Sequence, residues 1–165
     1  MADDLDFGWA LGVLFRSWQT AVTQAVDDLP HGPRGFQILN TLASTEHPPT
    51  QAELSMHLAI DRTVLTYVID DLATAGLVER RPDARDRRVR RLALTAAGSR
   101  RLADLRGRVA EAESGLFPGL GGADAAALRS LLERAAAGLH LGDGEHDACT
   151  VVSAILDDAQ RPAAG

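Results

Sequence analysis

Apolar residues in the first part of the chain recur at steps of three and four, the period of an α-helix that buries one face. The pattern starts with residues 6 to 29 and predicts a long helix, which Pro30, Gly32 and Pro33 end. The stripe that we expect this helix to bury contains Phe7, Leu11, Leu14, Trp18, Val22, Ala25 and Leu29. A second helix should begin near Pro33, because proline suits the first helical turn, and should stop at the HPP stretch, residues 47 to 49. Its expected inner side consists of Phe36, Leu39, Leu42 and Ala43.

The next residues predict two short helices joined by a tight turn. Thr50 and Glu53 form a capping-box pattern, in which each side chain bonds the backbone amide of the other residue, so a helix should start there. We expect it to stop at residues 59 to 60, with Leu54 and Leu58 inward. Asp61 can cap a second helix, which Gly76 ends and whose expected buried side is Val64, Leu65, Val68, Ile69 and Leu72. This succession is typical of a helix-turn-helix.

A β-hairpin and two further helices complete the predicted elements. Residues 77 to 81 and 87 to 94 are predicted as strands around a turn at residues 82 to 86, with Leu92 and Leu94 on one face. A long helix follows from Thr95, and Asp124 is expected to cap the last one after the break at residues 117 to 122. The two helices should bury stripes of Leu102, Leu105, Val109, Ala112 and Leu116, and of Leu128, Leu131, Leu132, Ala135 and Leu139. The fold class is therefore mainly α with a small β-hairpin wing.

Composition narrows the class of protein further. A chain of 165 residues can bury one core, so we expect a single domain over residues 1 to 165. The single Cys149 excludes an intrachain disulfide, and the first apolar run is too short to span a bilayer and follows acidic residues rather than a basic leader. We expect a cytoplasmic protein with no membrane partner. We find no nucleophile with a placed base, no metal-ligand set and no phosphate-binding glycine loop, so the sequence predicts neither an enzyme nor a cofactor.

Positive charge is concentrated in one region of an otherwise acidic chain. The formal net charge is −6 and lysine is absent, yet residues 80 to 108 hold eleven arginines against three aspartates. Seven of these arginines lie within a dozen positions, at 80, 81, 85, 87, 88, 90 and 91. A local basic feature of this kind predicts a face that binds an anionic partner, whatever the overall charge.

Residues 50 to 98, TQAELSMHLAIDRTVLTYVIDDLATAGLVERRPDARDRRVRRLALTAAG, resemble the MarR family of winged-helix transcription regulators. The sharpest match is DRRVRRLALT, residues 86 to 95, two residues after AGLVERRPD, and the flanking helices extend the resemblance over roughly residues 6 to 140. The resemblance implies a winged helix-turn-helix over residues 33 to 98 and a helical dimerisation part over residues 5 to 30 and 95 to 140. Residues 141 to 165 form a tail without a clear family counterpart, either a short helix or flexible.

The same resemblance implies where double-stranded DNA would be bound by a homodimer. Residues 61 to 72 would be the recognition helix in the major groove, and Arg88 would enter the minor groove with its guanidinium held by Asp86. Arg85 and Arg87 at the tip of the hairpin would contact phosphates, whereas at least one of Arg90 and Arg91 is expected to snorkel or to pair within the protein rather than contact DNA. The complete set of expected DNA-binding residues is Thr50, Gln51, Arg62, Thr63, Thr66, Tyr67, Arg85, Asp86, Arg87, Arg88 and Arg90.

Two further features leave alternatives open. An effector pocket for a small phenolic or anionic ligand would involve Trp18, His31, Arg34 and Phe36, but core packing or a capping role explains each of them as well. Asp70 and Asp71 make the recognition helix less basic than is usual in the family. The leading hypothesis is a ligand-responsive repressor that binds a near-palindromic operator, and the alternative is a winged-helix module for protein–protein interaction.

Overall fold

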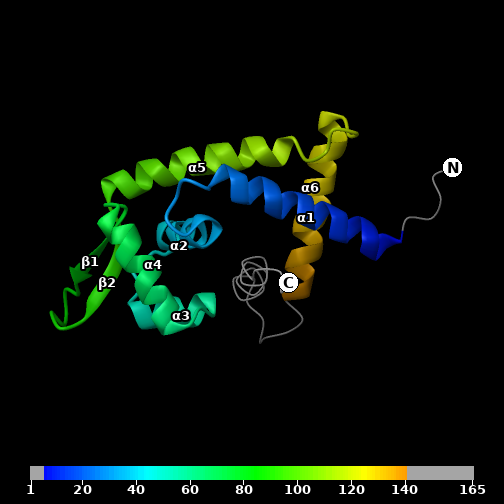
Figure 1. Ribbon diagram of the computed structural model, residues 1–165. Coiled ribbons are helices and arrows are strands. Elements are labelled where there is room, and N and C mark those ends of the chain that lie inside the picture. Colours follow the sequence, from blue (N-terminus) through cyan, green and yellow to red (C-terminus); the bar gives the residue numbers. More distant parts are fainter. Residues whose placement is uncertain (1–5, 141–165) are drawn as a thin grey trace, which may run out of the picture.

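The computed structural model of the chain describes residues 6–140, which form six helices and one β-hairpin (Figure 1). In chain order the elements are α1 (Phe7–Ala25), α2 (Gly32–Ser44), α3 (Gln51–Leu58), α4 (Arg62–Thr74), β1 (Val78–Pro82), β2 (Arg90–Leu94), α5 (Ala96–Ser114) and α6 (Gly122–His140). The predicted fold class, mainly α with a small hairpin, is confirmed. The long helices α1 and α5 lie side by side, and α3, α4 and the hairpin gather at one end of the molecule, away from α6 and from the start of α1.

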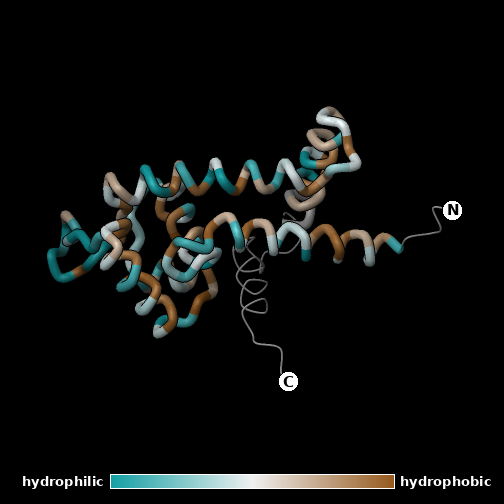
Figure 2. Tube along the Cα trace, turned by 45° about the horizontal axis from the view of Figure 1, so that its top comes forward, coloured by the Kyte–Doolittle hydropathy of each residue, from teal (hydrophilic) through white to brown (hydrophobic). Residues whose placement is uncertain are grey.

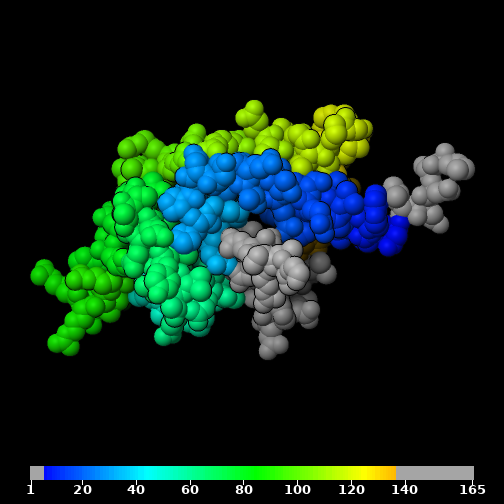
Figure 3. All heavy atoms as spheres, viewed as in Figure 1, coloured from blue at the N-terminus to red at the C-terminus, as the bar shows by residue number. Residues whose placement is uncertain are grey.

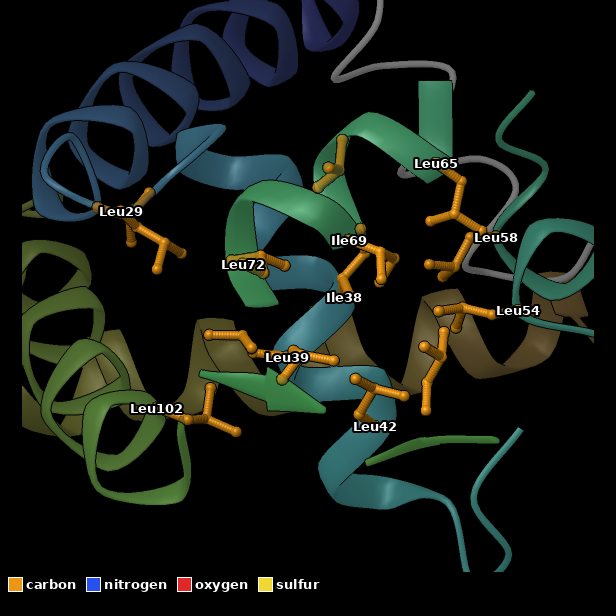
Figure 4. Close-up of a cluster of buried hydrophobic side chains, with 14 of the residues drawn as sticks. Leu29, Ile38, Leu39, Leu42, Leu54, Leu58, Leu65, Ile69, Leu72 and Leu102 are labelled. Atoms are coloured by element: carbon orange, nitrogen blue, oxygen red, sulfur yellow. The ribbon is translucent and has the colours of Figure 1, made fainter. Parts of the chain in front are cut away.

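The core lies where α2, α3 and α4 meet the hairpin and α5 (Figure 4). Leu39, Leu72 and Leu102 come from three different helices and point toward one another in this cluster. Most of the predicted inward positions are buried, among them Leu54, Leu58, Leu65, Val68, Ile69, Leu72, Leu92, Leu102 and Leu105. Each large aliphatic side chain removed from water contributes about 1.5–3 kcal/mol, so this cluster holds the helix-turn-helix and the hairpin as one unit.

Side-chain caps start three of the helices at the predicted residues. Thr50 Oγ1 accepts a hydrogen bond from the Glu53 amide at 3.2 Å, and a Glu53 carboxylate oxygen accepts one from the Thr50 amide at 2.7 Å, which confirms the capping box. Asp61 accepts hydrogen bonds from the amides of Thr63 and Val64 at the start of α4. Thr95 caps α5 in the same way, so short-range sequence rules set these helix starts.

The turn between α3 and α4 places an alanine in the left-handed region. Ala59 ends α3 with φ 51° and ψ 32°, and its amide donates to the carbonyls of Met56 and Ser55. Residues with a Cβ atom rarely adopt this conformation, which costs them about 1–2 kcal/mol relative to glycine. The tight turn therefore forms as predicted, although the residue at its centre is not the one that the turn favours.

Several predicted positions differ from the structure. The first helix ends at Ala25 rather than near residue 29, and Leu29 is buried in the following turn instead. In α2, Ile38 is fully buried and Ala43 is exposed, because the inner face of this helix is centred on Ile38, Leu39 and Leu42.

Two more differences concern helix faces and ends. Val64 is 38% exposed at the edge of the buried side of α4 rather than within it. Asp124 lies inside the first turn of α6, which starts at Gly122, so it is not the cap residue. A carboxylate in the first turn still favours the helix, because its negative charge faces the positive end of the helix dipole.

The start of α5 packs directly on the start of the hairpin. A Cβ atom built on Gly98 would lie 1.9 Å from the carbonyl oxygen of Leu77, so only glycine permits this approach. The Leu77 carbonyl oxygen also accepts from the Thr95 amide at 3.1 Å, and the Thr95 hydroxyl donates to the Gly76 carbonyl at 2.6 Å. These contacts fix the direction in which α5 leaves the winged helix-turn-helix.

The first half of the predicted stripe on α1 is exposed in the single protomer, not buried as predicted. Phe7 is 81% exposed, and the hydropathy colouring shows apolar residues along this half of the helix (Figure 2). Part of the stripe predicted for α6 is exposed as well, at Leu131, Leu132 and Ala135, and is not buried as predicted. The other large apolar residues exposed on α1 and before α6 are Trp9, Leu11, Val13, Leu14 and Leu120. Exposed large apolar side chains in this number are typical of an interaction face rather than of free solvent exposure. Within residues 6–140, no helix has the length and apolar character needed to cross a membrane.

Candidate nucleic-acid interface

The β-hairpin projects from the end of the molecule at which α3 and α4 lie (Figure 3). Its two strands pair in antiparallel register from Val78 opposite Leu94 to Pro82 opposite Arg90. The loop between them is closed by two backbone hydrogen bonds, from the Asp83 amide to the Val89 carbonyl and from the Val89 amide to the Asp86 carbonyl, each at 3.0 Å. The tip is therefore a folded turn with defined side-chain directions.

Two aspartates shape this turn through backbone amides. Asp83 Oδ1 accepts from the amides of Arg85 at 2.7 Å and Asp86 at 3.1 Å, and Asp86 Oδ1 accepts from the Arg88 amide at 2.9 Å. The expected ion pair between Asp86 and the Arg88 guanidinium is not formed, because the Asp86 carboxylate bonds the Arg88 backbone instead. In the described part of the chain, Asp86 positions the backbone of Arg88 and leaves the guanidinium exposed.

Arg91 is the arginine of the hairpin with the largest number of partners. Its guanidinium bonds Asp83, lies 3.5 Å from a Glu53 carboxylate oxygen and donates to the Pro48 carbonyl oxygen at 2.9 Å. The hydrogen bond from Arg91, with help from the Arg85 and Asp86 amides, lowers the pKa of Asp83 from 3.8 to about 2. Asp83 in turn raises the pKa of Arg91. The expectation that one of Arg90 and Arg91 pairs within the protein is thus confirmed, and the paired residue is Arg91.

Two further arginines of the basic cluster have carboxylate partners. Arg80 donates to Asp70 of α4 at 2.6 Å, and Arg81 pairs with Glu79 of the same strand. Among the described residues, the four remaining arginines of the cluster are exposed without an ion pair, namely Arg85, Arg87, Arg88 and Arg90. Positive charge available to an external anion is therefore concentrated at the tip of the hairpin.

The outer side of α4 carries polar residues that are accessible next to the hairpin. Arg62 and Thr63 are exposed, Tyr67 is 65% exposed, and Leu65 and Ile69 on the opposite side are fully buried. Thr66 is half-buried, and its hydroxyl accepts a hydrogen bond of 2.6 Å from the Gln51 side chain at the start of α3. Gln51 and Thr66, both expected DNA-binding residues, are thus brought together, whereas Thr50 is occupied with the cap of α3.

The acidic residues of α4 have intramolecular partners. Asp70 is paired with Arg80, as described above, and Asp71 lies 2.8 Å from His31 Nε2. His31 belongs to the turn between α1 and α2, where its backbone has φ 62°. The two pairs therefore connect α4 to the hairpin on one side and to the helical part on the other.

The residues expected around an effector lie on α1, α2 and the turn between them. Trp18 Nε1 donates to Glu113 of α5 at 3.0 Å, and His31 bonds Asp71 of α4, so their polar atoms point to different elements. Burial of the Arg34 side chain in α2 lowers the pKa of Arg34, and Phe36 packs partly buried against the core. Core packing, one of the two interpretations of Phe36, is observed.

Some residues of this end were not expected from the sequence. Met56 on α3 is 76% exposed, and no periodicity distinguishes it. The partners of Arg91 are separated from it by 8 to 43 residues, so no local motif indicates them. Gly98 could have been found, because it precedes Leu102, Leu105 and Val109 at helical steps and is the smallest residue of that stripe.

Two arginines on the outer side of α5 form ion pairs with aspartates that directly follow α1. Arg101 lies 2.6 Å from Asp28, and Arg108 pairs with Asp28 and Asp27. The two guanidinium groups lower the pKa of Asp28. Arg106 donates to Asn40 at 2.8 Å. Arg101 and Arg108 are therefore paired with acids of the same chain.

Comparisons with known proteins agree with this geometry. Residues 33–89 match the profile of the MarR family. The crystal structure of wild-type MarR from E. coli in its apo form has a TM-score of 0.66 at 22% identity, over 81% of this chain and 98% of that one. A MarR-family transcriptional regulator from Rhodococcus sp. RHA1 gives 0.61 at 24% identity, over 80% and 94%. CouR from Rhodococcus jostii RHA1 bound to p-coumaroyl-CoA gives 0.60 at 25% identity, over 78% and 90%.

Proposed function

Since this chain is a MarR-family winged-helix protein, we propose that it is a transcription regulator that binds a specific sequence of double-stranded DNA. The observation that carries the proposal is the set of exposed arginines at the hairpin tip beside the polar outer side of α4. An α-helix fits the major groove, where side chains read base edges, and an arginine in a narrow minor groove meets concentrated negative potential.

In this arrangement α4 enters the major groove and the hairpin reaches the adjacent minor groove. Arg62, Thr63 and Tyr67 contact bases or phosphates from α4, with Thr66 positioned by Gln51. Arg88 enters the minor groove, and Arg85, Arg87 and Arg90 contact phosphates, which orient the protein without reading sequence. Asp86 serves this contact indirectly, because it holds the backbone of Arg88.

The active form is a homodimer that binds a near-palindromic operator. The exposed apolar residues of α1 and α6 supply the surface, because such a stripe is stabilised when a second copy covers it. Two recognition helices related by a two-fold axis then face successive major grooves, about 34 Å apart. A regulator of this kind acts in the cytoplasm as a repressor.

A small phenolic or anionic effector would release the operator. The structure of CouR with p-coumaroyl-CoA supports a ligand of this chemistry for a protein of similar fold. Trp18, His31, Arg34 and Phe36 lie near the junction of the helical part and the winged helix, where His31 already bonds Asp71 of α4. A ligand can change operator affinity only if it binds more tightly to a dimer conformation with one distance between the recognition helices than to a conformation with another distance.

The alternative function, a module for protein interaction, rests on the acidic residues Asp70 and Asp71. Both carboxylates have partners within the chain, Arg80 and His31, so they offer a partner protein less free charge than the sequence indicates. The pairing favours DNA binding over this alternative.

The experiment that tests the proposed function is selection of bound duplexes from a random library, followed by affinity measurements on the enriched operator. We expect an inverted repeat, and we expect Arg88→Ala to weaken its binding by about 1–3 kcal/mol per groove contact. Arg108→Ala is the matched control, because Arg108 pairs with Asp27 and Asp28 on the helical part. Equal losses for the two variants, with dimers intact, would contradict the hairpin contact, and no enrichment with the wild-type protein would contradict operator recognition.

A further inference from the structure

Arg91 joins three segments that are separate in the sequence. Its guanidinium bonds Asp83 at the start of the hairpin loop, approaches Glu53 in the first turn of α3 and donates to the carbonyl of Pro48 in the segment before that helix. We call Glu53, Asp83 and Arg91 the Arg91 cluster. The Asp83 side chain is only 13% exposed, and Arg91 is 33% exposed, so both differ from the open arginines of the tip.

The same junction contains backbone contacts. The Leu92 amide donates to the Pro49 carbonyl at 2.8 Å, and Thr50 and Arg91 form an isolated antiparallel bridge. The hairpin is therefore attached to the beginning of α3 by one short stretch of backbone, and the Arg91 cluster lies at that stretch. On its other side, Asp83 holds the turn that carries Arg85 through the Arg85 and Asp86 amides.

We infer that Arg91 is a positioning residue that sets the location of the arginine-bearing hairpin tip relative to α3 and α4, and that it does so through Asp83 rather than by contacting DNA. The inference rests on the proposed function, in which the tip and α4 must reach neighbouring grooves of one duplex at the same time. Because the hairpin is two-stranded and projecting, a small rotation at its base moves its tip by a larger distance. The guanidinium of Arg91 has hydrogen-bond acceptors in two different segments, Asp83 and the Pro48 carbonyl, and a second carboxylate, Glu53, at 3.5 Å. This arrangement suits the planar fork of arginine but not a point charge.

Neutralising Asp83 distinguishes positioning from direct electrostatics, because the two predict opposite signs. Asp83→Asn removes a negative charge from the face that approaches phosphates, so simple electrostatics predicts tighter DNA binding. The asparagine oxygen can still accept the Arg85 and Asp86 amides, and only the ion pair to Arg91 is lost. Positioning therefore predicts operator binding weaker by at least about fivefold, comparable to losing one groove contact.

Glu79→Gln is the matched control. Glu79 is also a carboxylate of the hairpin that pairs with an arginine, but its partner Arg81 is two residues away on the same strand. Its neutralisation leaves the junction with α3 unchanged, so we expect operator binding that equals or exceeds that of the wild-type protein. Arg91→Gln should weaken operator binding as Asp83→Asn does. Because each substitution removes the same Asp83–Arg91 interaction, the double variant should lose no more operator affinity than the weaker-binding of the two single variants.

Amide hydrogen exchange of Leu92 measures the junction without DNA. We expect Leu92 to exchange faster in Asp83→Asn and Arg91→Gln, while the Leu77 amide, which donates to the Leu72 carbonyl at 2.9 Å, is unchanged. If the Leu92 amide exchanges at the wild-type rate in both variants, the inference is overturned whatever the DNA-binding result. It is also overturned if the Asp83→Asn protein binds the operator as tightly as the wild-type protein. Failure of the wild-type protein to select any sequence would refute the proposed function separately, and Leu92 exchange would then decide alone whether the Arg91 cluster holds the hairpin.

Discussion

Replacement of Gly98 by alanine should destabilise the fold strongly, because the added methyl group meets backbone that has no room to move. The new Cβ would lie 1.9 Å from the Leu77 carbonyl oxygen and 2.9 Å from its carbonyl carbon. An ordinary contact needs about 3.4 Å, so α5 or the start of β1 must shift by more than an ångström. Overpacking costs about 1–3 kcal/mol when side chains can adjust. Here the obstacle is a carbonyl that accepts the Thr95 amide, so we expect a loss of about 3 kcal/mol or more.

Gly107→Ala on the same helix is the control for the helical preference of alanine. A Cβ at Gly107 meets nothing within 4 Å, so this variant should be stabilised by about 0.5–1 kcal/mol. Urea unfolding followed by circular dichroism, at one protomer concentration for all variants, gives both free energies. A Gly98→Ala protein as stable as the wild type would refute the argument that the contact between α5 and the hairpin is closed to a side chain.

Two further predictions concern the turn and the hairpin. Ala59→Gly should raise the free energy of unfolding by about 1 kcal/mol, because glycine adopts φ 51° without steric cost, and a lower thermal midpoint would contradict this. The pKa of Asp83 is about 2 in the folded protein and 3.8 ordinarily, so its pair with Arg91 contributes stability that is complete above about pH 4 and is lost as the pH falls through about 2. A carboxyl titration by NMR with the Asp83 midpoint near 4 would contradict the pairing.

Helix starts and the hairpin could be predicted because their causes are local. The capping box at Thr50, the cap at Asp61 and the alternation around Leu92 each depend on residues a few positions apart. Predictions are weaker where several residues compete for one face. In α2, Ala43 lies at the margin of the apolar stripe, and Ile38 takes the central place because the helix is oriented by its larger side chains.

The partners of the arginines could not be predicted, because they depend on tertiary contacts. The Asp86–Arg88 pair implied by the family resemblance is replaced by a bond to the Arg88 backbone, and Arg91 bonds residues from two other segments. A sequence of closely spaced arginines indicates total positive charge. It does not indicate which guanidinium groups are already neutralised, since a carboxylate partner can be distant in the sequence, as Glu53 is from Arg91 and Asp28 is from Arg108.

The division of the basic cluster into paired arginines and exposed arginines at the hairpin tip also affects how an acidic protein approaches a polyanion. At physiological salt the electric field of an exposed charge decays over about 8 Å, so a duplex near the hairpin senses the tip arginines and little of the chain's −6 net charge. In dilute buffer that decay length grows to about 30 Å at 0.01 M, and the acidic remainder then repels the duplex before the tip can reach it. Under the proposed function, long-range repulsion therefore opposes the first encounter in dilute buffer, whereas at physiological salt the hairpin arginines act on DNA at short range.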